Sequence, residues 1–213
     1  MVHDDVVRAF VLADELEWRS GGERDGAHWD LDGWIGKDVR RLWFRTEGIS
    51  EGDRLDEAHA HVLYGHAVAP WWEVVGGIRQ DFEPGRSQTW AAAGIQGFAP
   101  YRIDLEVTGY LGGEGRTQLR ADAANDLRLT RQLIVQSRVE ASLNGKADAE
   151  RLIGAGLSSM EVGLRFRYEI RRELAPYAGV VWRSTFFETA DFARAAGEDV
   201  GGFQLVAGVR LWR

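Results

Sequence analysis

The sequence predicts an all-β protein, a closed antiparallel transmembrane β-barrel of about 12 strands (roughly 10–12) with a charged lumen. Three observations lead to this fold class. Apolar and charged residues alternate with the period of two that is typical of a β-strand. The charged face carries both signs, as expected of a barrel interior that must neutralise itself, so the apolar and aromatic face lies outside against lipid. No stretch approaches the roughly 18 consecutive apolar residues of a membrane helix.

The alternation is clearest in residues 161–177, EVGLRFRYEIRRELAPY. In an extended strand every second side chain lies on the same face, whereas a helix would spread these charges around its circumference. Val162, Leu164, Phe166, Tyr168 and Ile170 would therefore face outward, and Glu161, Arg165, Arg167 and Glu169 would face inward.

The first six strands follow from alternation and from the turn residues between them. SGGERDG separates the first strand from the second, and EPGRS separates the fifth from the sixth. The sixth segment is small and apolar, so its facing is the hardest to assign. These strands are expected at residues 6–19, 27–36, 42–48, 57–67, 72–82 and 90–99, with Phe10, Leu12 and Leu16 outward and Glu17 inward in the first.

The last six strands follow in the same way. In residues 102–111, Leu105 and Val107 are expected to face outward and alternate with charged neighbours that face inward. GGEG forms the next turn. These strands are expected at residues 102–111, 117–127, 133–140, 161–177, 177–187 and 203–212.

The connections between strands are expected to differ at the two ends of the barrel. Proline cannot donate to a strand ladder, so it marks the point where pairing ends. We expect short periplasmic turns at Gly36-Lys37-Asp38, Pro70-Trp71 and Pro100-Tyr101, and longer loops at residues 20–26, 50–56, 144–151 and 188–201 at the opposite end.

Six tryptophans lie near the ends of the expected strands. Indole rings favour the headgroup level of a bilayer, where one edge is wet and the body is apolar. The alternative is that they fill the core of a soluble protein. The six are Trp18, Trp29, Trp72, Trp90, Trp182 and Trp212.

Composition narrows the classes of function. The chain has 213 residues, no cysteine and a net charge of −7. A single domain over residues 1–213 is therefore expected, without disulfides or thiolate metal sites, and the acidic balance argues against nucleic-acid binding. The N-terminus MVHDDVVRAF lacks the features of a signal peptide, so we expect the sequence to be the C-terminal domain of a longer precursor.

Several segments resemble the copper-resistance protein B family across essentially the whole chain. They are LYGHAVAPWWEVVGGIRQD (63–81), GIQGFAPY (94–101), LTRQLIVQSRVE (129–140), GLRFRYEIRRELAPYAGV (163–180) and VAGVRLW (206–212), of which 163–180 is the most specific.

The resemblance implies a barrel in the Gram-negative outer membrane, in contact with its lipid, that takes part in copper tolerance. It further implies a periplasmic multicopper oxidase as a partner. Family members commonly carry a signal peptide and a Met- and His-rich segment before the barrel, and this sequence contains neither. Its two methionines are too few for a Met-rich copper(I) site, and Met160, a further metal candidate, lies just before the matched segment 163–180.

The best metal candidate is His59-Ala60-His61, because residues i and i+2 of a strand share a face and their rings can converge on one ion. Imidazole suits copper(II), and Glu57 lies on the same face. The alternative is that both histidines are ordinary polar lumen residues. His28, with Asp30 and Asp32, is a second group, which also has the alternative of a solvated strand end.

The charged residues that face inward could have either of two roles. They could pair across strands and fix the shape of the lumen, or their carboxylates could pass cations along. No catalytic motif is recognisable, so we do not expect an enzyme. Two functions remain: a barrel that binds or moves copper across the outer membrane, and a structural or interaction barrel that supports a periplasmic copper oxidase without binding copper itself.

Overall fold

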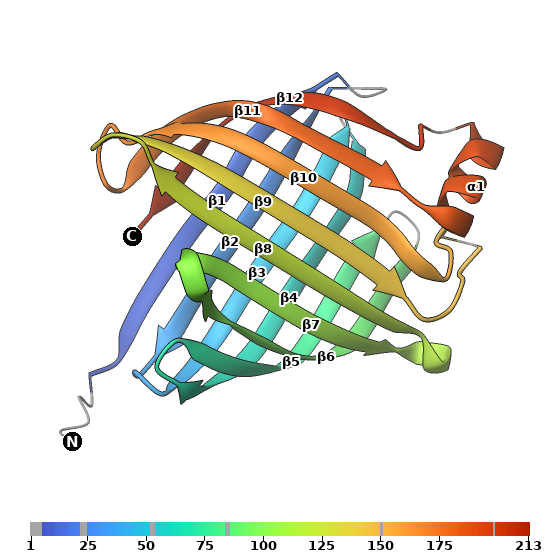
Figure 1. Ribbon diagram of the computed structural model, residues 1–213. Helices are drawn as coiled ribbons and strands as arrows, with labels where there is room; N and C mark the ends of the chain where they lie inside the picture. The colour runs from blue at the N-terminus through green and yellow to red at the C-terminus, as the bar shows by residue number, and fades with distance from the viewer. Residues whose placement is uncertain (1–5, 22–24, 52–53, 84–85, 150, 198) are drawn as a thin grey trace.

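The protein is a closed antiparallel barrel of 12 strands in the computed structural model, in which each strand pairs with its neighbour in sequence and β1 pairs with β12 (Figure 1). The structure describes residues 6–21, 25–51, 54–83, 86–149, 151–197 and 199–213. Its elements are β1 (Arg8–Ser20), β2 (Gly26–Gly36), β3 (Arg40–Glu51), β4 (Arg54–Ala69), β5 (Trp72–Glu83), β6 (Arg86–Ala99), β7 (Ile103–Gly112), β8 (Thr117–Arg128), β9 (Leu133–Asn144), β10 (Gly156–Tyr168), β11 (Leu174–Thr185), α1 (Phe187–Ala196) and β12 (Gly201–Trp212), with single 3-10 turns at Pro100–Arg102 and Gly113–Gly115.

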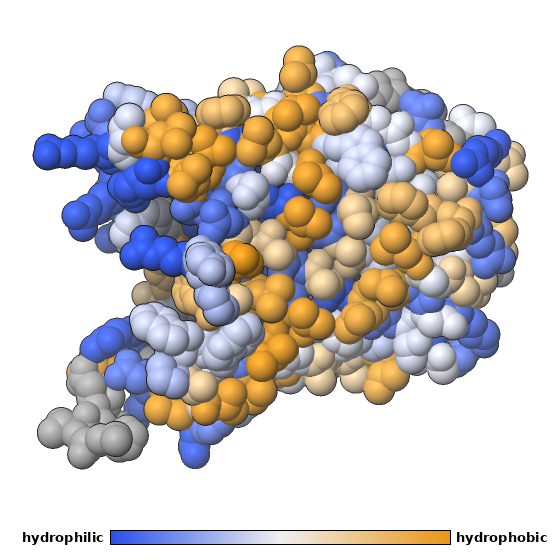
Figure 2. All heavy atoms as spheres, in the orientation of Figure 1, coloured by the Kyte–Doolittle hydropathy of each residue, from blue (hydrophilic) through white to orange (hydrophobic). Residues whose placement is uncertain are grey.

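The two faces of the wall separate apolar from charged side chains, as the alternation predicts. On β10, Phe166 is 49% exposed whereas Arg165 is 1% exposed. Apolar side chains spread over the outer wall and hydrophilic ones gather toward the two ends (Figure 2). No helix among the described residues is long and apolar enough to cross a membrane. The predicted faces are confirmed for Leu16, Leu105, Val107, Leu164 and Phe166 outside and for Glu17, Arg165 and Arg167 inside.

The predicted outward facing of Phe10 and Leu12 is wrong. The pairing of β1 with β2 shifts by one residue between Ala13 and Glu15, which is a β-bulge. A one-residue shift moves every following side chain to the other face. Phe10 consequently pairs with Trp34 and stacks on it at 6.4 Å between ring centroids, on the lumen side.

The two ends of the barrel differ as predicted. Strand β1 begins and β12 ends at the end opposite α1 (Figure 1), and Pro70 lies in a turn there. The expected loop at 188–201 is partly helical, because α1 forms within it. The expected loop at 50–56 is shorter, since β3 extends to Glu51 and β4 starts at Arg54; residues 52 and 53 lie outside the described part.

The stretch 161–177 is not one strand. Strand β10 ends at Tyr168 and β11 starts at Leu174, so Glu169 and Ile170 belong to the turn between them. Strand-like alternation continues through this turn, which is why the sequence does not reveal the break.

The tryptophans divide between the two faces. Trp18 is exposed on the outer wall, and Trp29 donates from its indole to Thr46 there. Trp90 is wrongly assigned to the headgroup level, because it is buried in the lumen and donates to Asp81 at 2.7 Å. Trp212 likewise lies against lumen-facing Phe10.

Two kinds of contact fill the lumen. An apolar cluster of Leu63, Val75, Trp90, Ala92 and Tyr110 lies against β4 to β7. The other side is ionic. We call Glu15, Glu17, Arg19, Arg138 and Arg165 the ionic layer.

The ionic layer ties strands together across the lumen. Arg165 on β10 donates to Glu15 at 2.7 Å and to Glu17 at 2.9 and 3.0 Å, although both glutamates lie on β1. Arg138 on β9 donates to Glu15 at 3.0 Å and to Asp30 on β2 at 2.9 Å. These charge-assisted bonds connect strands that are not neighbours in the wall, so they fix the shape of the barrel.

The first prediction concerns depth in the outer wall. Val107→Arg, in the middle of β7, should lower the free energy of unfolding from a bilayer by about 2–4 kcal/mol, because a cation at the midplane is poorly solvated. Leu111→Arg, outward at the end of the same strand, should cost about 0–1 kcal/mol. Urea titration of vesicle-embedded protein measures both, and equal costs would contradict the assignment of a lipid-facing wall.

The second prediction concerns the ionic layer. Arg165→Met should destabilise the protein by about 3–5 kcal/mol, because Glu15 and Glu17 would lose a buried countercharge. Neutralising both in the same protein (Glu15→Gln with Glu17→Gln) should recover part of the loss. Arg194→Met breaks only the exposed pair with Asp191, and should cost less than about 1 kcal/mol in the same assay.

Candidate functional site

The candidate site is a row of polar side chains on the lumen wall. Strand register places Glu47 on β3 directly between Asp30 on β2 and His59 on β4. His28 is the next inward residue of β2 toward the loops, and His61 follows His59 on β4. Tyr110 reaches this row from β7. We call His28, Glu47, His59, His61 and Tyr110 the histidine row.

Each member of the histidine row contacts the next. The carboxylate of Glu47 bridges two histidines, with Oε1 3.6 Å from Nε2 of His28 and Oε2 3.2 Å from Nε2 of His59. The rings of His59 and His61 meet edge to face with centroids 5.4 Å apart. Nε2 of His61 lies 3.2 Å from the hydroxyl of Tyr110.

The remaining ring nitrogens of His59 and His61 are uncommitted. Both side chains are buried, 5% and 6% exposed, and Nδ1 of each has no hydrogen-bond partner among the described residues. A buried nitrogen without a hydrogen-bond partner is costly. If Nε2–H donates to Glu47 and to Tyr110, each Nδ1 carries a lone pair and can bind a metal ion. The donor set therefore fits copper(II), which prefers nitrogen and oxygen ligands.

The surrounding charges permit a cation. Arg120 lies close, with Nη1 3.0 Å from Nε2 of His59. Because a guanidinium only donates, Arg120 and Glu47 compete for this nitrogen, and copper binding at Nδ1 requires the tautomer in which Nε2–H donates to Glu47. The guanidinium of Arg120 is already paired with two carboxylates, Glu47 and Glu140, the latter at 2.7 Å. The three groups together carry one net negative charge, so Arg120 does not leave the site positive.

A cavity of about 860 Å³ leads to the histidine row from the loop end of the barrel. Glu57, His59 and Arg120 line it from one wall, and Met160 lines it from β10. His61 lies beyond the cavity lining, next to the apolar cluster. An ion that enters this cavity from the loop end would therefore reach His59 before His61.

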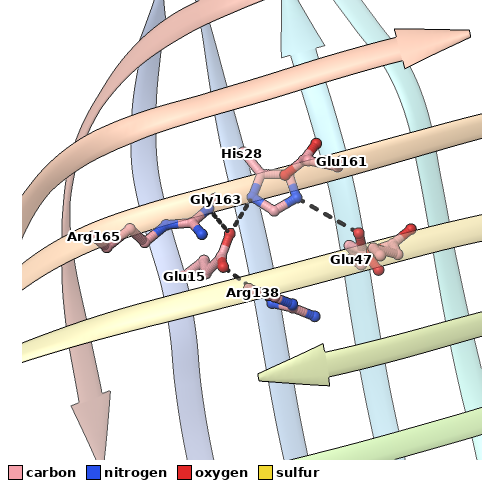
Figure 3. A pocket seen from close by; sticks show the side chains of 8 residues that line it. Glu15, His28, Glu47, Arg138, Glu161, Gly163 and Arg165 are labelled. Carbon is pink, nitrogen blue, oxygen red and sulfur yellow. Dashed lines mark hydrogen bonds and ion pairs between the residues drawn. The ribbon is translucent and has the colours of Figure 1, made fainter. Parts of the chain in front are cut away.

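A second group, Glu15, Glu17 and His28, has ligand atoms within 4.8 Å of one another. Figure 3 shows His28 between Glu15 and Glu47, with Arg138 and Arg165 both on Glu15. Glu17 accepts from Arg19, Arg165 and Tyr177. Since arginines occupy these oxygen atoms, the group fits a metal less well than His59 and His61 do.

The structure brings together only some of the predicted site residues. His59 and His61 meet as predicted. His28 contacts Glu15 and Glu47 in place of the expected Asp30 and Asp32, which pair with Arg138 and Arg45. Met160 lies six strands away from β4 in the barrel, on the opposite wall, so it does not join the pair.

Glu47 and Tyr110 were not recognised as site residues from the sequence. The inward parity of both can be read from the alternation. Glu47 lies beside His59 because of strand register, and Tyr110 reaches His61 because its side chain spans two intervening strands. A local sequence pattern encodes neither.

Comparison with known sequences places the chain in a family. The family model of Copper resistance protein B precursor (CopB) matches residues 7–213. A Copper resistance protein B homolog from Pseudomonas syringae pv. tomato is 47% identical over 211 residues, covering 99% of this chain and 72% of the relative. Copper resistance protein B from Escherichia coli is 41% identical over 211 residues, covering 99% and 71%.

Solved structures share the fold. The NanC porin superposes with a TM-score of 0.59 at 11% identity, covering 96% of this chain and 99% of the porin. The KdgM porin in complex with disordered oligogalacturonate gives 0.55 at 6% identity, covering 96% and 98%. At such identities the likeness concerns the barrel alone, whereas the sequence matches show descent: the chain belongs to the copper resistance protein B family.

Proposed function

We propose that this barrel lies in the Gram-negative outer membrane and contributes to copper tolerance by binding copper(II) at His59 and His61. One observation carries the proposal: two adjacent imidazoles are buried, and each has an Nδ1 atom without a partner among the described residues. Membership in a copper resistance family supports copper as the metal, and the apolar outer wall supports the location in a membrane.

The neighbours of the two histidines suit this role. A metal-binding histidine usually donates its other N–H to a carboxylate or a similar acceptor, which fixes the ring and raises its basicity. Glu47 and Tyr110 are placed to accept from Nε2 of His59 and His61. Glu57 is the best placed further ligand, because it lines the same cavity on the same strand.

The interior favours binding over free passage. Beyond the cavity, the apolar cluster and the ionic layer fill the described lumen with buried side chains. An ion that crosses the barrel would have to separate pairs such as Arg165 with Glu17, so copper would move slowly through a bound state. We propose no catalytic step.

The third prediction tests the site. His59→Ala with His61→Ala should weaken copper(II) binding at least roughly 100-fold, since both nitrogen ligands are lost. His66→Ala is the matched control, because it removes an imidazole from the same strand outside the row. Titration calorimetry gives the affinity, and the nitrogen couplings in the copper(II) EPR spectrum should disappear with the pair. Unchanged binding in the double variant would exclude the site and favour the alternative, a barrel that supports a periplasmic copper oxidase.

The fourth prediction concerns the bridging carboxylate. Glu47→Gln should lower copper(II) affinity by roughly 10–100-fold while both EPR nitrogen couplings remain, because Glu47 orients His59 without binding the ion. Asp38→Asn removes a carboxylate from the turn before β3, at the opposite end of the barrel, and should leave the affinity unchanged. Loss of a nitrogen coupling in Glu47→Gln would show instead that His59 has left the ion.

A further inference from the structure

Two turns at the end opposite α1 form one platform. The turn between β8 and β9 covers residues 129–132, and the turn between β10 and β11 covers residues 169–173. The backbone N–H of Glu169 donates to the carbonyl of Gln132 at 2.8 Å, and the hydroxyl of Tyr168 donates to the side chain of Gln132 at 2.9 Å. We call these two turns the turn platform.

The backbone of the turn platform is also fixed from the last strand. The indole of Trp212 donates to the carbonyl of Arg172 at 2.5 Å, and its backbone N–H donates to the carbonyl of Glu173 at 3.3 Å. The backbone positions from which the platform side chains extend are therefore fixed.

Three arginines on the platform lack a countercharge. Arg131, Arg171 and Arg172 are exposed, and no guanidinium of the three has an ion pair or hydrogen bond with a described residue. An ion pair at the edge of the platform joins Arg128, the last residue of β8, to Glu169 at 3.2 Å. The two turns also carry two carboxylates: Glu169 pairs with Arg128, and Glu173 forms no ion pair with a described residue. Counting Arg128, four arginines stand against two glutamates, and this surplus of positive charge favours an external anion, although the chain as a whole carries a charge of −7.

An apolar strip on the outer wall adjoins these arginines. Leu127 on β8 pairs across the sheet with Val135 on β9, which pairs with Phe166 on β10. Leu127 and Phe166 are exposed on the outside, as are Leu129 and Ile170 in the turns themselves. Cationic side chains at the end of an apolar wall match a molecule with an anionic head and hydrocarbon chains.

We propose that the turn platform binds an anionic phospholipid, with its phosphate held by Arg131, Arg171 and Arg172 and its acyl chains lying along Leu127, Val135 and Phe166. Guanidinium groups bind phosphate oxygens in a fork geometry, which makes arginine well suited to this head group. The proposal rests on the membrane location given under the proposed function. It selects a lipid over a free phosphate because the apolar strip is continuous with the arginines.

The test uses the whole chain in detergent, with phosphatidylglycerol and phosphatidylcholine of equal chain length added together. Native mass spectrometry counts the lipid retained by the protein. The unaltered protein should retain phosphatidylglycerol at least 10-fold better than phosphatidylcholine. The variant Arg131→Gln with Arg171→Gln and Arg172→Gln should lose that preference. The control Arg40→Gln with Arg102→Gln and Arg213→Gln changes the net charge equally, also at exposed positions of this end, and should keep it.

Three outcomes would overturn the proposal. Equal loss in both triple variants would show a general charge effect. Competition by glycerophosphoglycerol as effective as by the intact lipid would show that the acyl chains do not matter. Displacement by poly-glutamate at equal molarity would identify a docking surface for an acidic protein segment.

A separate measurement keeps this test distinct from that of the proposed function. Co-flotation with phosphatidylcholine vesicles reports membrane insertion, and copper(II) titration reports the histidine site. The lipid proposal fails on its own if insertion and copper binding are normal in the platform variant and its lipid preference is unchanged.

Discussion

Neutralisation of buried charge inside the barrel is the constraint on which the rest of the structure depends. Arg165 is 1% exposed and Glu15 is 1% exposed, so neither ion can rely on water. A buried charge without a partner is strongly destabilising, and therefore each must meet its countercharge with good geometry. Because the partners lie on strands that are not neighbours, satisfying the charges also sets the shape of the closed wall.

The candidate metal site follows from where that neutralisation stops. His28 is surrounded by Glu15, Glu17 and Glu47, whose oxygens arginines already occupy, so its neighbourhood is complete without an ion. His59 and His61 lie at the border between the ionic side and the apolar cluster. Each finds a partner for Nε2 and none among the described residues for Nδ1, and for that reason we propose copper(II) binding at this border.

The alternation of side chains was sufficient to predict the barrel, the 12 strands and most of the facing, because a wall between lipid and ions imposes period two. It failed at Phe10 and Leu12, since a bulge inverts parity without a local sequence signal. It also missed α1 and the break after Tyr168. At the site it identified His59 and His61 but could not assign Glu47 or Tyr110 to them, because only strand register brings these residues together.

Arginines in the lumen are paired with carboxylates, whereas three arginines of the turn platform are not. In the lumen, carboxylates on neighbouring and on facing strands are close enough to neutralise them, so the protein supplies both charges. At the turn platform the backbone is equally well fixed, yet no carboxylate of the described residues reaches Arg131, Arg171 or Arg172. Water solvates these exposed guanidinium groups, so they stay available to an anion from outside the chain, and the apolar outer wall adjoins them. A ligand that combines anion and hydrocarbon satisfies both surfaces at once, which an inorganic anion does not.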